Sequence, residues 1–317
     1  TAMKKLLTIL AMSTLAHWQI STLTLAQNLA PNPSFENYAN CPTGLGLPVS
    51  FGGYDPVSEA IPWYRPTDAS SDYFNACNGA IVGVPGNVFG SQPARTGVAY
   101  TGGYAYASFS EDFREYVQGP LSTPLIAGQT YCVELYVSLT DNSNYATDDI
   151  GVLFSDTAIL TTADCQGGLR QDCGPMPYTP QINNPAGNFL TDKINWTLIS
   201  GTFTAVGGED HIIIGNLKDD ANTDNLDSLG GPSPHAYYYV DDVCVVECGG
   251  VKDTTICEGD DVILDAGNPG ADFLWSTGAI TQTITISTTG DYSVEVTNSN
   301  NCISSDTINI NVDDCTE

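Results

Sequence analysis

Basic side chains are scarce in this 317-residue chain, in which nine Lys and Arg stand against 37 Asp and Glu, a formal net charge of −28. This deficit argues against nucleic acid and anionic membrane surfaces as partners, because both attract positively charged surfaces. An acidic surface keeps a protein soluble and attracts cations such as calcium. We expect solubility to account for most of the carboxylates.

Catalytic signatures are also missing. The chain holds three histidines and no G-x-S-x-G, H-E-x-x-H or C-x-x-C string. These absences argue against a serine hydrolase, a zincin and a structural zinc site. A glycoside hydrolase needs only two carboxylates, so it stays as the enzymatic alternative to a non-catalytic protein.

Long apolar runs are absent, which argues against a membrane span. Residues 1–26 carry Lys4 and Lys5, then the apolar run Leu6–Leu15, and end in small residues at Ala26. This layout is typical of a secretory signal peptide. We therefore expect an exported, soluble mature chain that lies outside the cell or on its surface.

All ten cysteines lie beyond this leader, and an even count in an exported chain predicts disulfides. Spacing alone does not determine connectivity, so the pairs are working hypotheses. We expect Cys41 with Cys77, Cys132 with Cys244, Cys165 with Cys173, Cys248 with Cys315 and, foremost, Cys257 with Cys302.

Alternation of apolar and polar residues predicts an all-β chain without a sustained helical period. A composition shift at 248–252 separates a first domain, 27–247, from a second, 253–317. The second domain should be a small β-sandwich with Trp275 in its core; Trp196 should likewise be a core residue of the first. The predicted strands are 130–139, 150–154, 196–203, 211–215 and 237–245, then 262–264, 273–278, 283–286, 292–296 and 307–312.

The motifs N-L-x-P-N-x-x-F-E at 28–36 and Y-V-D-D-V at 239–243 resemble those of jelly-roll carbohydrate-binding and galactose-binding-like modules. Likewise C-E-G-D at 257–260, W-S-T-G at 275–278 and G-D-Y-S-V at 290–294 look like the Ig-like or PKD-like repeats of surface proteins that gliding bacteria export by the type IX system. The resemblance implies a jelly-roll β-sandwich followed by an Ig-like sandwich. Such proteins continue into a sorting domain, so we expect this chain to be a fragment or a processed form.

The resemblance also implies a structural calcium ion (Ca2+) held by Glu36 and Asp241, with backbone carbonyls near Asn32 and Ser34 as further ligands. Calcium takes six to eight oxygens, and two inward carboxylates without basic neighbours would repel each other. The alternative is a metal-free pair that accepts backbone N–H groups. Because neighbouring strand residues point to opposite faces, we expect Asp242 to face solvent.

A second acidic run, Lys218 to Asn225, contains a D-x-N-x-D core. Asn225 stands where a calcium loop requires glycine, and Gly231 stands where it requires a bidentate glutamate. We therefore expect a solvated loop, and we expect Asp148 and Asp149 to form a turn before a strand.

Sugar recognition needs aromatic rings and polar groups that bind hydroxyls. Tyr104 and Tyr106 would share one face of a strand and offer a two-ring platform; packing in a core is the alternative. Arg114 could bind a ligand carboxylate or sulfate, or pair with an acid of the protein itself. The candidate ligand-binding residues are Trp63, Tyr64, Tyr73, Tyr100, Tyr104, Tyr106 and Arg114.

Three functions follow, in order of preference. The first is a non-catalytic binding or adhesion protein, stabilised by calcium, that recognises a glycan or another cell-surface component. The second is a self-associating structural subunit of an extracellular filament, sheath or adhesin. The third is a carbohydrate-active hydrolase.

Overall fold

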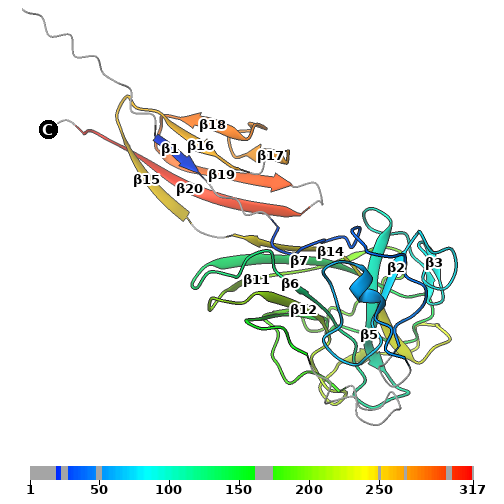
Figure 1. Cartoon of the computed structure of the whole chain (residues 1–317). Helices are drawn as coiled ribbons and strands as arrows, with labels where there is room; N and C mark the ends of the chain where they lie inside the picture. Colours follow the sequence, from blue (N-terminus) through cyan, green and yellow to red (C-terminus); the bar gives the residue numbers. More distant parts are fainter. Residues whose placement is uncertain are drawn as a thin grey trace, which may run out of the picture.

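The computed structural model describes residues 19–22, 28–47, 52–160, 174–248, 251–267, 270–297 and 302–315. Within these ranges Figure 1 shows two groups of β-strands: one is built from residues 72–247, and the other from residues 251–313 together with Gln19–Thr22 from the N-terminal part of the chain. The predicted leader lies outside the described residues except for Gln19–Thr22. No helix in the described part of the chain is long and apolar enough to cross a membrane.

The first group is a sandwich of two antiparallel sheets, as the sequence predicts. A five-stranded sheet has the order β11-β7-β14-β5-β2, and a four-stranded sheet has the order β10-β9-β12-β6. The strands of the larger sheet are β2 (Asp72–Asn75), β5 (Ala99–Ala107), β7 (Thr130–Leu139), β11 (Thr197–Thr204) and β14 (His235–Glu247). Those of the smaller sheet are β6 (Val117–Pro120), β9 (Gly151–Ser155), β10 (Ile182–Asn183) and β12 (His211–Gly215).

Short elements lie outside the two main sheets of this sandwich. A 3-10 helix, η2 (Pro56–Glu59), precedes β2, and its first turn is capped by the Asp55 side chain. Two small ladders pair β3 (Gly86–Asn87) with β4 (Gly90–Ser91) and β8 (Ala146–Thr147) with β13 (Asn225–Leu226).

The main core lies between the two sheets. Along β7 buried residues alternate with half-exposed ones, so Val133, Leu135 and Val137 share the inner face. They belong to one apolar cluster with Val152 of β9 and Ile212 of β12. Side chains that alternate at period two thus bury one face of each sheet against the other.

The N-terminal segment is tied to β14. The Asn28 side chain bonds the backbone of β14 at two places. Its amide N–H donates to the Val243 carbonyl at 2.9 Å, and its oxygen accepts the Val245 N–H at 2.9 Å. Leu29 N–H donates to the Val245 carbonyl at 2.7 Å. The connection expected from the 28–36 motif is therefore present.

The second group is a smaller sandwich. One sheet has the order β15-β20-β19-β17, and the other has the order β1-β16-β18. Trp275 is buried in its core and donates its indole N–H to the Thr281 carbonyl at 2.8 Å. The strands are β1 (Gln19–Thr22), β15 (Val251–Cys257), β16 (Val262–Asp265), β17 (Asp272–Trp275), β18 (Thr283–Ile286), β19 (Gly290–Thr297) and β20 (Ile303–Asp313).

The described cysteines form four disulfides, of which one was predicted. Cys41 bonds Cys77 as expected. The predicted pairs of Cys132 with Cys244, Cys248 with Cys315 and Cys257 with Cys302 are wrong, because the strand register brings other cysteines together; the pair Cys165 and Cys173 lies outside the described residues. The observed pairs are Cys132 with Cys248, Cys244 with Cys302 and Cys257 with Cys315, with Cα–Cα distances of 5.5, 5.8 and 5.3 Å.

Candidate functional site

Several predicted sugar-binding residues are interior. Trp63, Tyr73 and Tyr100 are at most 1% exposed, so they cannot stack on a ligand. Trp63 donates its indole N–H to the Pro31 carbonyl at 2.9 Å, and Tyr73 donates its hydroxyl to the Phe35 carbonyl at 2.9 Å. Both therefore hold the N-terminal motif in place, and their assignment to a glycan site is wrong.

Tyr104 and Tyr106 do not form a platform. In β5, Tyr104 pairs with Tyr237 and Tyr106 pairs with Ala236, so Ala105 is an extra residue without a partner in β14. This bulge reverses the alternation of faces. Tyr104 consequently packs on the outer side of the sheet, whereas Tyr106 packs against the core between the sheets. Both rings are half-buried, as is Tyr64, and a ligand role for these single residues stays a prediction.

The outer face of the five-stranded sheet is partly closed by the protein's own rings. Phe89, between β3 and β4, stacks on Tyr237 with ring centroids 4.0 Å apart. Phe74, Tyr100 and Tyr239 complete this buried cluster. Trp196, expected in the core, instead lies half-buried on the same outer face, where its ring meets the edge of Tyr100.

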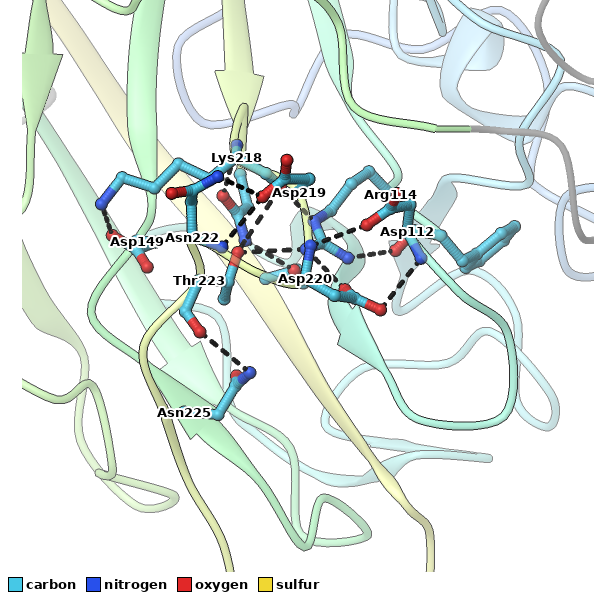
Figure 2. Close-up of polar contacts among 12 residues, drawn as sticks. Asp112, Arg114, Asp149, Lys218, Asp219, Asp220, Asn222, Thr223 and Asn225 are labelled. Carbon is cyan, nitrogen blue, oxygen red and sulfur yellow. Dashed lines mark hydrogen bonds and ion pairs between the residues drawn. The ribbon is translucent and has the colours of Figure 1, made fainter.

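Arg114 is fully buried and serves the protein rather than a ligand. Its guanidinium pairs with Asp220 Oδ1 at 2.8 Å and donates to Thr223 Oγ1 at 3.0 Å. It also donates to the carbonyls of Lys218 at 3.0 Å and Phe113 at 2.9 Å. In Figure 2 the Arg114 side chain reaches in among the residues of the 218–223 loop. Binding of an external anion by Arg114 is thus excluded by its burial, and the alternative of an internal ion pair is confirmed.

Glu36 and Asp241 both bind the segment 95–99. Glu36 Oε1 accepts the N–H groups of Val98 at 2.7 Å and Ala99 at 2.9 Å, and Asp241 Oδ2 accepts that of Arg95 at 2.8 Å. Gly97 has φ = 63°, and a Cβ there would lie 2.2 Å from Glu36 Oε1, so glycine is needed for this approach. These contacts match the metal-free alternative for the two carboxylates.

A cation at this place would still relieve an electrostatic cost. Burial, and then the charge of Asp242, raise the pKa of Asp241 well above its usual range; burial is also the main cause of a raised pKa for Glu36. No group of three or more His, Cys, Asp or Glu suited to a metal occurs among the described residues. Calcium would therefore need backbone carbonyls beside Glu36 and Asp241, and it stays a prediction.

Asp242 is buried, contrary to expectation. The β14 register against β7 shifts between Asp241 and Cys244, and Asp242 has φ = 50°. Its carboxylate pairs with the Arg95 guanidinium and accepts the Thr96 hydroxyl, both at 2.5 Å. A bulge thus turns two neighbouring acids toward the same segment.

An open cleft of ≈ 530 Å³ lies on another part of the sandwich, between the segment 174–180 and the loop that follows β12. This volume is within the range of small-ligand sites. One wall carries three prolines and Tyr178, which is 47% exposed. The other wall comes from the loop after β12 and carries Leu217, Lys218, Asp219 and Asn222; Asn183 also lines the cleft.

Both walls are anchored to the same buried segment. The Tyr116 hydroxyl donates to the Asn216 carbonyl at 2.8 Å and accepts the Met176 N–H at 3.2 Å, so one oxygen holds the start of each wall. Met176 and Leu217 pack with Tyr116 in a separate apolar cluster. Two residues away, Arg114 binds the 218–223 loop as described above. Arg114 and Tyr116 are therefore positioning residues for the cleft.

The polar groups of the 218–222 wall are themselves tied down. Lys218 Nζ binds Asp149 Oδ1, and this hydrogen bond is the main cause of a raised pKa for Lys218. Asp219 Oδ1 accepts both the backbone N–H and the amide of Asn222, at 2.9 and 2.6 Å (Figure 2). Asp149, expected in a simple turn, is a buried anchor of the wall. Asp220, the first acid of the D-x-N-x-D core, is likewise bound within the protein, by Arg114.

Sequence reasoning missed the cleft because its walls are about forty residues apart in the chain. The signal available was a long Pro-rich loop containing Tyr178, since loops of that length on a rigid scaffold are often functional. Nothing local in the sequence pairs that loop with Lys218 or Asn222.

Neither a protein family nor a curated protein matches the chain. Solved structures similar to it include the CBM22-1 xylan-binding domain of Paenibacillus barcinonensis Xyn10C, at 12% identity and TM-score 0.32 over 71% of this chain and 99% of that one. The K3 cleaved adhesin domain of Lys-gingipain from Porphyromonas gingivalis w83 shows 16% identity and TM-score 0.29 over 71% and 99%. TmCBM61, solved with β-1,4-galactotriose, shows 12% and 0.27 over 70% and 99%. Similarity at this level carries no information about function.

Proposed function

We propose that this protein is an exported, non-catalytic binding protein that recognises a glycan through the cleft between 174–180 and 217–222. The observation that supports this most directly is the exposed Tyr178 ring, which lines an open cleft together with the polar groups of Asn222 and Lys218. A tyrosine ring offers an apolar face for a sugar ring, and amides fix its hydroxyls.

The rigidity of the walls supports recognition of a preformed ligand. Pro175, Pro177 and Pro180 restrict the backbone on one side, and the buried Arg114 restrains the other. A wall that is already ordered loses little conformational freedom when a ligand binds. The four disulfides of the described residues suit a protein that works outside the cell.

The composition of the cleft favours binding over hydrolysis. Glycoside hydrolysis needs two carboxyl groups that flank the scissile bond. Among the described residues that line the cleft, Asp219 is the one carboxylate, and one of its oxygens is occupied by Asn222.

The test is retention of the purified chain on a panel of immobilised polysaccharides, with Tyr178→Ala and a matched control. Tyr38 is 43% exposed, close to the 47% of Tyr178, and it does not line the cleft. Tyr178→Ala should weaken retention about tenfold, the value of one stacked ring, while Tyr38→Ala should leave it unchanged. Equal retention by both variants would place the site elsewhere. Ordered polymers without retention would instead favour a structural subunit.

A further inference from the structure

We infer that the cleft selects uncharged sugars and rejects chains that carry uronate or sulfate groups. This inference rests on the proposed glycan-binding function and adds the chemical class of the ligand. It depends on how the protein uses its few cations around the cleft.

Lys218 is the cation that lines the cleft among the described residues, and its charge is already compensated. Its side chain is 45% exposed, yet its ammonium binds Asp149, which is itself only 7% exposed. Asp149 is held from its other side, because Oδ2 accepts the Asp224 N–H at 2.8 Å. The pair is therefore fixed by the protein, and an incoming anion would have to compete with a carboxylate that is already in place.

The remaining charges that act on Lys218 are negative. Asp148 and Asp224 act on Lys218 alongside Asp149, and Asp219 lines the cleft. Arg114, the other cation of this region, is buried and paired with Asp220 (Figure 2). One exposed cation thus faces several carboxylates, in a chain whose net charge is −28. A uronate or sulfate that entered would meet net repulsion.

Groups that bind neutral hydroxyls are nevertheless present. Asn183 and Asn222 both line the cleft and are exposed, and each amide can donate and accept hydrogen bonds. The Tyr178 ring adds a stacking face that needs no charge on the sugar. The same cleft that repels an anion therefore offers partners to an uncharged sugar.

The experiment compares polymers that share a backbone and differ in charge: hydroxyethyl-cellulose with carboxymethyl-cellulose, and methyl-esterified with de-esterified homogalacturonan. Retention of the full chain is measured at low and high salt. The variant Asp149→Asn releases the Lys218 charge, and Asp272→Asn removes an exposed charge from β17 of the second sandwich as a control. Circular dichroism checks that Asp149→Asn folds. If it does not, Lys218→Gln tests the role of the Lys218 charge independently.

The wild type should retain at least one neutral polymer and bind its charged partner about tenfold more weakly. Asp149→Asn should gain about fivefold in retention on the charged polymer, and high salt should remove this gain; Asp272→Asn should gain nothing. Lys218→Gln should leave retention on the charged polymer unchanged, because that retention is already weak in the wild type. Stronger wild-type retention on the charged polymers, lost in Lys218→Gln, would overturn the charge inference and leave glycan binding intact. Retention on no polymer of either kind would overturn both.

Discussion

Replacing Arg114 with methionine should destabilise the first sandwich by about 4 kcal/mol and loosen one wall of the cleft. Methionine has a similar unbranched length, so little volume is lost and the effect comes from the guanidinium. That group makes four contacts, to Asp220, Thr223 and two carbonyls, all between 2.8 and 3.0 Å.

The size of this destabilisation follows from the acceptors that lose the guanidinium. A hydrogen bond from a charged donor contributes about 1.5–3 kcal/mol, and removing one partner of a buried ion pair costs about 3–5 kcal/mol. Asp220 is 27% exposed and can regain water, so the full sum of the contacts is not expected. Arg114→Lys keeps the charge, but the lysine cannot reach every acceptor. It should lower the free energy of unfolding by about half as much as Arg114→Met.

The assay is equilibrium unfolding in denaturant, followed by circular dichroism, with hydrogen exchange of the Asp220 amide as a local probe. Lys218→Met is the matched control, because Lys218 also pairs with an aspartate of this region but is 45% exposed. Lys218→Met should lower the free energy of unfolding by at most about 1 kcal/mol. If Arg114→Met costs no more than Lys218→Met, the guanidinium is not the anchor of the wall.

The calcium hypothesis predicts that calcium raises the melting temperature and chelation lowers it, and that Glu36→Gln abolishes this dependence; identical melting curves with and without chelator would favour the hydrogen-bonded pair. In chelator, stability should fall as the pH rises above about 4. The sign follows because burial raises the pKa of Asp241, so the native state binds the proton more tightly than the unfolded state and loses that advantage on ionisation. If Glu36→Gln leaves the slope of stability against pH unchanged, the Glu36 carboxyl does not contribute to this pH dependence. Trp63→Ala should cost about 4 kcal/mol in denaturant unfolding, because the ring is 1% exposed and packs on Phe35; a loss below about 1 kcal/mol would refute its role as a clamp on the N-terminal motif.

Strand positions were largely predictable because they depend on local alternation. Residues 130–139, 211–215 and 283–286 form strands with the predicted bounds, and 150–154 is displaced by one residue. In β7 and β18 buried residues alternate with more exposed ones, so the period of two is visible in the sequence; β9 and β12 are buried on both faces and were recognisable as short apolar runs. The tie of Asn28 to β14 was likewise recognisable from its motif.

The side-chain faces at two bulges were not predictable from the same rule. One extra residue at Ala105 separates Tyr104 from Tyr106, and the shift after Asp241 turns Asp242 inward. A bulge is a property of the pairing between two strands, so neither strand shows it alone. The disulfide partners failed for a related reason, since Cys132 meets Cys248 only through the register of the sheet and the turn of the chain beyond β14.

The sequence by itself determined that this is an acidic, cysteine-rich, all-β protein without the motifs of common catalytic sites, because composition and period-two patterning are local properties. Only the tertiary structure revealed the cleft that we propose as the ligand site. It placed Arg114 in the interior as a positioning residue and brought Tyr178, Lys218 and Asn222 to the lining of one cleft. Such a cleft arises from contacts between distant segments, and the energy that holds it lies in buried bonds that no single segment contains.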